Sequence, residues 1–362
     1  MNALEHQLDY VFQDTLPASG TTFEVAPGIF WLRMPLPFAL DHINLWLLRD
    51  QDENGSPGWT IIDCGISDET IKRHWEEIFE QHLEGLPVLR VICTHFHPDH
   101  LGLADWLTRG GDKARWNVRL WMTLGEYTMG RVQAAGTAQG SSAGGEAAAQ
   151  HFASHGLTDP EGLAQIRERA GYFTRLVPSM PPAYRRLREG NFVTIGAHSW
   201  QVITGYGHST EHCALYCEEL KVLISGDMVL PRISTNISVF DIEPESNPLA
   251  LYLESLERYE PLPTDTLTLP SHGKPFRGLQ TRLQQLREHH VARLAEVREA
   301  CAVAPQSAAD IVPVMFKRKL DLHQMTFALG EALAHLHLFW HAGELKRTKG
   351  EDGVWRFGVV AD

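Results

Sequence analysis

The stretch Thr94-His95-Phe96-His97-Pro98-Asp99-His100 carries three imidazoles and one carboxylate. It directly follows the apolar run at 88–93, which is typical of a buried strand. Neutral imidazole is a preferred protein ligand for zinc, and a carboxylate often completes such a site. Separately hydrogen-bonded histidines in a solvated loop are the alternative interpretation. The spacing HxHxDH at the end of a predicted strand favours a metal site.

Composition limits the class of protein. The 362 residues suit one large domain with a smaller one, and a hydrophobic content of 43% supports a packed core. The net charge of -13 disfavours indiscriminate binding to nucleic acid or to an anionic membrane. The five cysteines form no CxxC pair, which predicts reduced thiols. There is neither a membrane-spanning apolar run nor a signal-like N-terminal stretch, so we expect a cytoplasmic protein.

The chain alternates between strand-rich and helix-rich regions. We expect strands over 23–64, 88–93, 192–225 and 266–270, and a helix over 68–84 with Ile71, Trp75 and Ile78 on one face. A second helix is predicted to start at Pro98 and to continue past Trp106. Residues 112–190 read as an inserted helical region with a small-residue break at 136–145. Long insertions of this kind often serve as lids or substrate walls.

Three later residues are candidates to complete the metal site. His208, Asp227 and His272 lie in the segments GYGHS, SGD and SHG, each after a predicted strand. Strand ends meet at one edge of a sheet, and the neighbouring glycines allow tight turns there. Taken singly, His208 and His272 are typical of hydrogen-bonded core histidines, and Asp227 is typical of a turn cap after a strand. Their joint occurrence after strands favours metal ligation.

The ordered set THFHPDH, GYGHS, SGD and SHG resembles the metallo-β-lactamase superfamily, and most of all its glyoxalase-II-like hydrolase branch. The resemblance covers about residues 23–280 and implies an α/β fold, the αββα sandwich, with metals at one edge between two sheets. It implies two divalent ions, Zn²⁺ with Fe or Mn as alternatives. By this resemblance the metal ligands are His95, His97, Asp99, His100, His208, Asp227 and His272.

The resemblance also assigns roles to these ligands. His95, His97 and His208 would hold the first metal, and Asp99, His100 and His272 the second, with Asp227 bridging both. A hydroxide between the metals would attack a small ester or thioester, because metal coordination brings the pKa of water down towards neutrality. Asp99 would be the catalytic residue, orienting the hydroxide or accepting its proton. Asp63, in the segment IDCG, matches a strand-end position of the family, and we expect it to orient a metal ligand.

Two features depart from the family pattern and leave the substrate open. Leu103 stands where many relatives have a second glycine, and the interval from His100 to His208 is long because of the insertion. The partner that we expect is a small-molecule substrate. The candidate contacts of this substrate are Tyr127, Arg131, Arg232, Ser234 and Asn236.

Several other reactions are weighed against this one. Asp227 and the lack of a signal disfavour an exported zinc β-lactamase, and His97 stands where diiron flavoproteins of this fold carry a glutamate. A mononuclear-iron persulfide dioxygenase needs fewer ligands and stays open, as does an endoribonuclease or another phosphodiesterase. A binding protein without chemistry is disfavoured by the intact ligand set.

The C-terminal region differs in character from the rest. Three helical segments after about residue 282 and a hairpin at 343–357 resemble the winged-helix appendage of some superfamily hydrolases. We therefore divide the chain into a metallo-β-lactamase-like catalytic domain at 1–281, with an insertion at about 122–190, and a winged-helix-like domain at 282–362. The basic cluster Lys317-Arg318-Lys319 and a second at 346–349 fit either phosphate contacts or solvated charge, and the near balance of acids and bases favours the latter. We then expect this domain to pack against the catalytic domain, to form a homodimer or to cover the edge of the active site.

Overall fold

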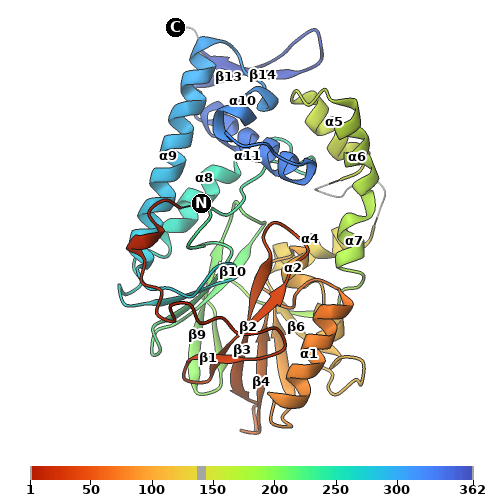
Figure 1. Ribbon diagram of the computed structural model, residues 1–362, viewed down its shortest axis with the longest axis vertical. Coiled ribbons are helices and arrows are strands. Elements are labelled where there is room, and N and C mark those ends of the chain that lie inside the picture. The colour runs from red at the N-terminus through yellow and green to blue at the C-terminus, as the bar shows by residue number, and fades with distance from the viewer. Residues whose placement is uncertain (1, 137–143, 361–362) are drawn as a thin grey trace.

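The structure, a computed structural model, describes residues 2–136 and 144–360. Two β-sheets face each other, and helices cover their outer faces (Figure 1). The αββα sandwich predicted from the sequence is thereby confirmed. The small-residue break predicted at 136–145 falls largely outside the described residues.

The first sheet has seven strands in chain order, antiparallel at its first three junctions and parallel at the next three. Residues 43–48 of the third strand are buried without interruption, because both faces of this sheet are covered. The strands are β1 (Phe23–Ala26), β2 (Ile29–Pro35), β3 (His42–Gln51), β4 (Pro57–Ile62), β5 (Val88–Ile92), β6 (Leu120–Met122) and β7 (Tyr184–Arg186).

The second sheet has five strands in the order β12-β11-β10-β9-β8, and only the β11–β12 pair is parallel. The core between the sheets joins Trp31 and Trp46 of the first sheet to Trp200 and Leu215 of the second. The strands are β8 (Phe192–Ile195), β9 (His198–Gly205), β10 (His212–Cys217), β11 (Val222–Gly226) and β12 (Leu267–Pro270).

Helix α1 (Glu69–Gln81) covers the outer face of the first sheet, as the sequence predicts. The Asp68 carboxylate caps it by accepting the N–H of Thr70 at 2.7 Å. The helix buries Ile71, Trp75 and Ile78, and it ends before the predicted limit at residue 84.

The helix predicted from Pro98 past Trp106 is wrong in one respect, since it is two helices, α2 (Pro98–Leu101) and α3 (Ala104–Thr108). The loop that follows β4 packs directly against the break. A Cβ atom at Gly102 would lie 2.6 Å from the carbonyl oxygen of Gly65. The N–H of Leu103 donates to that same carbonyl at 3.1 Å. Because this loop lies so close to Gly102 and accepts the N–H of Leu103, the helix is interrupted between α2 and α3.

The insertion is helical, as predicted, and its α5 packs into the C-terminal core. Phe152 of α5 belongs to the same buried cluster as Ile311 and Leu333. The N–H of Ala309 donates to the carbonyl of His155 at 3.1 Å. The insertion helices are α4 (Leu124–Ala134), α5 (Glu146–Ser154), α6 (Pro160–Glu168) and α7 (Tyr172–Leu176).

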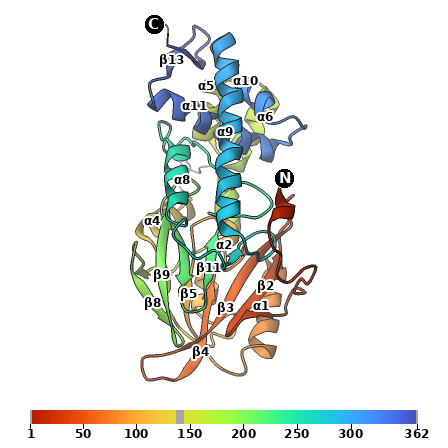
Figure 2. The same ribbon diagram turned by 90° about the vertical axis from the view of Figure 1, so that its left-hand side faces the viewer.

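The C-terminal region has three helices followed by a hairpin, which confirms the predicted order of elements. These helices lie beyond one end of the sandwich, beside α5 and α6 (Figure 1), and α9 extends from the sandwich into this region (Figure 2). No helix within 2–136 and 144–360 is long and apolar enough to cross a membrane. The elements are α9 (Leu279–Val303), α10 (Ala308–Met315), α11 (Leu322–His341), β13 (Leu345–Lys349) and β14 (Trp355–Val359), and the helix α8 (Pro248–Glu257) precedes β12.

Candidate metal centre

The seven predicted metal ligands lie together where strands of the two sheets end. The HxHxDH segment follows β5 of the first sheet, whereas His208, Asp227 and His272 follow β9, β11 and β12 of the second. They form two groups in which the ligand atoms all lie within 4.8 Å of one another. The first group is His95, His97, His208 and Asp227, and the second is Asp99, His100 and His272.

In the first group, ring nitrogens of three histidines lie close to one another. Nε2 of His95 lies 2.9 Å from Nδ1 of His97 and 3.2 Å from Nε2 of His208. The Asp227 carboxylate completes the group, with Oδ2 3.4 Å from Nε2 of His208. Three ring nitrogens that converge in this way, together with a carboxylate, form a donor set that suits a metal cation.

The second group is built around the carboxylate of Asp99. Its Oδ2 lies 3.6 Å from Nε2 of His100 and 3.4 Å from Nε2 of His272. The other oxygen of Asp227, Oδ1, lies 3.6 Å from Nε2 of His100 and 3.5 Å from Nε2 of His272. Asp227 thus turns one carboxylate oxygen, Oδ2, to the first group and the other, Oδ1, to the second.

The donor set fits divalent cations. Nε2 of His100 and Oδ1 of Asp227 are buried and have no hydrogen-bond partner among the described residues. Such atoms are costly to bury unless a ligand satisfies them. Five imidazoles with two carboxylates match the preferences of zinc and of other first-row metals.

The electrostatics of the centre without metal point the same way. Burial and the facing His208 lower the pKa of His97 to about 3, so this imidazole is neutral and can ligate. Burial also acts to lower the pKa of His272, but the carboxylates of Asp227 and Asp99 outweigh it and raise that pKa to about 10. The protonated His272 balances the negative charge of the two carboxylates, a role that a bound metal cation would take over.

Each of three ligands is oriented through its second nitrogen. Nδ1 of His100 lies 2.8 Å from Oδ2 of Asp63, the contact expected from the sequence. Nδ1 of His208 faces the carbonyl of Asn236, and Nδ1 of His272 faces the carbonyl of His42, each at 2.8 Å. Partners of this kind fix the tautomer and leave Nε2 free to ligate.

Glu126 of α4 is a buried residue that the sequence analysis missed. Its Oε2 accepts the N–H of Phe96 at 2.9 Å, between two of the predicted ligands. Its Oε1 accepts the N–H of Glu211 at 2.5 Å and the hydroxyl of Thr210 at 3.0 Å, in the loop after His208. One carboxylate from the insertion therefore joins two loops that carry predicted metal ligands.

His212 is a second buried residue that the sequence analysis missed. Its Nε2 accepts the N–H of Asp227 at 3.1 Å. The neighbouring Gly226 has a positive φ of 54°, and a Cβ there would lie 2.3 Å from Nε2 of His212. The glycine therefore makes room for the histidine that positions the Asp227 backbone.

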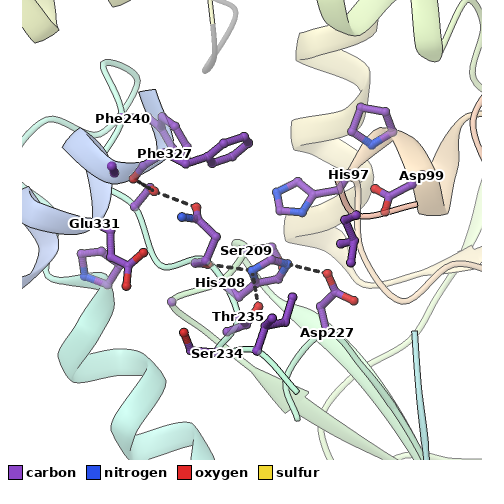
Figure 3. A pocket seen from close by; sticks show the side chains of 18 of the residues that line it. His97, Asp99, His208, Ser209, Asp227, Ser234, Thr235, Phe240, Phe327 and Glu331 are labelled. Atoms are coloured by element: carbon purple, nitrogen blue, oxygen red, sulfur yellow. Dashed lines mark hydrogen bonds and ion pairs between the residues drawn. The ribbon is translucent and has the colours of Figure 1, made fainter. Parts of the chain in front are cut away.

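A cavity of about 830 Å³ opens beside this centre. Figure 3 shows His97, Asp99, His208 and Asp227 around one part of it, and Phe240, Phe327 and Glu331 across from them. Of the predicted substrate contacts, Ser234 and Asn236 line the cavity.

The other predicted substrate contacts have different surroundings. The hydroxyl of Tyr127 donates to the carbonyl of Pro181, and Arg232 forms an ion pair with Glu5. Arg131 lies exposed on α4. None of these three is among the described residues that line the cavity.

Comparison with known proteins identifies the family. A model of the metallo-beta-lactamase superfamily matches residues 40–272, and a model of the metallo-beta-lactamase-like C-terminal domain matches residues 294–360. The chain therefore belongs to the metallo-beta-lactamase superfamily, and it carries the residues of a metallo-hydrolase.

Three relatives each cover more than three quarters of the chain. A crystal structure of a beta-lactamase domain protein from Burkholderia ambifaria is 68% identical, covers 99% of this chain and 100% of that one, and superposes with a TM-score of 0.94. The probable metallo-hydrolase YqjP of Bacillus subtilis is 23% identical over 84% of this chain and 90% of its own length. The acyl-coenzyme A thioesterase MBLAC2 of Gallus gallus is 26% identical over 78% of this chain and 91% of its own length.

Proposed function

We propose that this protein is a binuclear metal-dependent hydrolase of carboxylic esters or thioesters, of the glyoxalase-II-like type. The position of Asp227 carries this proposal. Its two carboxylate oxygens face the two ligand groups at 3.4 to 3.6 Å. A carboxylate that faces both ligand groups in this way can bridge two cations.

Two divalent cations, for which we propose Zn²⁺ with Fe or Mn as alternatives, would lower the pKa of a shared water towards neutrality and polarise the ester carbonyl. His95, His97 and His208 would hold one cation, and His100, His272 and Asp99 the other, with Asp227 between them. Asp99 also lines the cavity, so its carboxylate can accept a hydrogen bond from the attacking water and orient it. Ser234 and Asn236 would face the substrate.

The names of two relatives support hydrolysis of an ester or thioester. The curated name of the chicken relative specifies a thioesterase, and that of the Bacillus relative specifies a metallo-hydrolase. A mononuclear-iron persulfide dioxygenase remains the less favoured alternative, since it would leave the Asp99 group without a role. The five free, buried cysteines suit the reducing cytoplasm that we propose as the compartment.

A phosphodiesterase is the second candidate, and one observation supports it. Arg318, from the basic cluster for which phosphate contact is the less favoured interpretation of the sequence, lines the cavity. The helices and hairpin after α9 have the element order of a winged helix, and we propose that they form such a domain. Its contribution to the cavity wall favours a role in shaping the pocket for a small molecule.

The test is hydrolysis by protein with a measured metal content. We expect zinc-loaded protein to cleave members of a panel of esters, thioesters and lactones, and to cleave bis-p-nitrophenyl phosphate poorly. Asp99→Asn should lower kcat at least 100-fold while the first ligand group still binds metal. Tightly bound metal without turnover across the panel would refute the proposal.

A further inference from the structure

The cavity beside the metal centre reaches from the predicted ligands to the C-terminal region. Its walls include His97, Asp99 and Asp227 at one side and Phe327 and Glu331 of α11 at the other. Figure 3 shows these two sets of side chains across the same space. A substrate whose reacting carbon lies at the metal centre therefore extends towards α11.

Aromatic rings that come from four separate parts of the chain line the cavity. Phe38 comes from the loop between β2 and β3, Phe173 from α7, Phe240 from the segment after β11, and Phe327 from α11. Apolar walls bind hydrocarbon because it leaves water on entry. A volume of about 830 Å³ is near the upper end for pockets that enclose a ligand, so an acetyl-sized group would leave most of these rings uncovered.

We infer that the substrate carries a hydrocarbon acyl group of medium length, and that α11 forms the wall that limits this length. This inference rests on the proposed hydrolase function and names its substrate class. It also gives the C-terminal region a role, because a truncated chain would lack one side of the acyl pocket.

Glu331 is the one acidic side chain that α11 contributes to the cavity wall among the described residues. Burial raises its pKa to about 7, so a large share of this carboxyl is protonated at neutral pH and tolerates apolar neighbours. An acyl chain that ends in an amine would instead pair with an ionised Glu331. The protein should therefore distinguish a hydrocarbon acyl chain from one that ends in an amine.

The first experiment measures kcat/KM of the zinc-loaded protein for acyl thioesters of one common thiol, from two to twelve carbons. We expect kcat/KM to rise about two- to fourfold for each added methylene until the chain reaches the wall, and then to fall. A thioester with an ω-amino group should be hydrolysed more slowly than its hydrocarbon analogue. A flat profile or a preference for the amine would overturn the inference.

Variants of α11 test whether this helix is the wall. Ala328 is 3% exposed and lines the cavity, so Ala328→Phe should shorten the available space. We expect the ratio of kcat/KM for decanoyl to that for acetyl thioester to fall at least tenfold. Ala342→Phe adds the same ring at the exposed C-cap of α11 and should leave this ratio unchanged. Phe327→Ala, which opens the cavity, should move the optimum to longer chains and gives a second test should Ala328→Phe fail to fold.

Binding without turnover separates this inference from the proposed function. We expect calorimetry to detect 1-octanol binding to the zinc-loaded protein, at least tenfold tighter than 1-butanol, and weakened by Ala328→Phe but not by Ala342→Phe. If no ester, thioester or lactone of the panel is hydrolysed but octanol binds in this way, the hydrolase proposal fails and the apolar pocket stands. If short thioesters are hydrolysed but chain length and octanol have no effect, the hydrolase stands and the acyl pocket is refuted.

Discussion

Oδ2 of Asp63 lies 2.8 Å from Nδ1 of His100, and both side chains are buried. Asp63 follows the last residue of β4 and has a positive φ of 62°, a conformation that costs most residues about 1 kcal/mol or more. Its other oxygen accepts the N–H of Thr94 at 2.7 Å. The single carboxylate of Asp63 thus holds Thr94, directly before the HxHxDH segment, and His100, the last residue of that segment.

Replacing Asp63 should weaken metal binding at the second ligand group. In Asp63→Ala the Nδ1 of His100 loses its carboxylate partner and keeps only the Thr94 hydroxyl at 3.2 Å, so Nε2 is held less firmly towards Asp99. Loss of such a partner typically costs 10- to 100-fold in metal affinity. Competition with a chromophoric chelator measures this affinity, and circular dichroism checks that the fold is retained. Unchanged affinity at both sites would show that Asp63 has no orienting role.

Glu126 should matter for metal binding although it touches no metal ligand side chain. Glu126→Ala removes the acceptor for the N–H groups of Phe96 and Glu211, and we expect about a tenfold loss of zinc affinity with a lower Tm. Glu126→Gln should not restore affinity, because its amide group would place a donor against one of these donors. The exposed Glu168→Ala on α6 is the matched control. Equal zinc affinity in all three variants would contradict the prediction.

The convergence of the seven predicted ligands could be predicted because their signals are local. HxHxDH, GYGHS, SGD and SHG each combine a ligand with a strand end, and strand ends converge in this fold. Asp63 was predicted for the same reason, from its position after β4.

The supporting residues could not be predicted, because their roles depend on contacts between distant segments. Glu126 lies 30 positions from Phe96 and 85 from Glu211, and within α4 it looks like an ordinary solvent-facing acid of a first turn. The cavity had no local signal either, since Phe240 and Phe327 meet only when α11 packs over the sandwich. The break at Gly102 was missed because the loop that displaces the helix comes from residues 65–67.

The number of metals bound should depend on which ligand is removed. His272→Ala removes a residue of the second group alone, so we expect the zinc content to fall from about two to about one per chain. Asp227→Ala removes the shared carboxylate and should weaken both sites. Mass spectrometry of the metal content after dialysis measures these values. A content of two in His272→Ala would show that this residue is not a ligand.

The basic cluster at 317–319 tests the phosphodiesterase alternative. All three of its side chains are exposed, and Arg318 lines the cavity. Under the ester hydrolase proposal we expect no salt-dependent binding of single-stranded RNA, with or without neutralisation of the cluster to glutamine. Binding that weakens with salt, and that is lost in this variant but kept when Lys346 and Lys349 are neutralised, would favour the phosphodiesterase.

Glu331 should make the stability of the protein depend on pH. Burial raises its pKa from 4.5 to about 7 in the folded protein, partly countered by Arg293. The folded state then holds a proton that the unfolded chain has lost, so stability falls as the pH rises from about 4.5 through about 7. Glu331→Gln removes this penalty.

The free energy of unfolding of Glu331→Gln should therefore exceed that of the unaltered protein by about 1–3 kcal/mol at pH 8, and by little at pH 5. Urea unfolding at both pH values measures the difference. The exposed Glu257→Gln on α8 is the control, because its side chain stays in water. A gain of equal size at both pH values would mean that the substitution acts through packing rather than through the buried charge, and Glu331 would then ionise as freely as an acid at the surface.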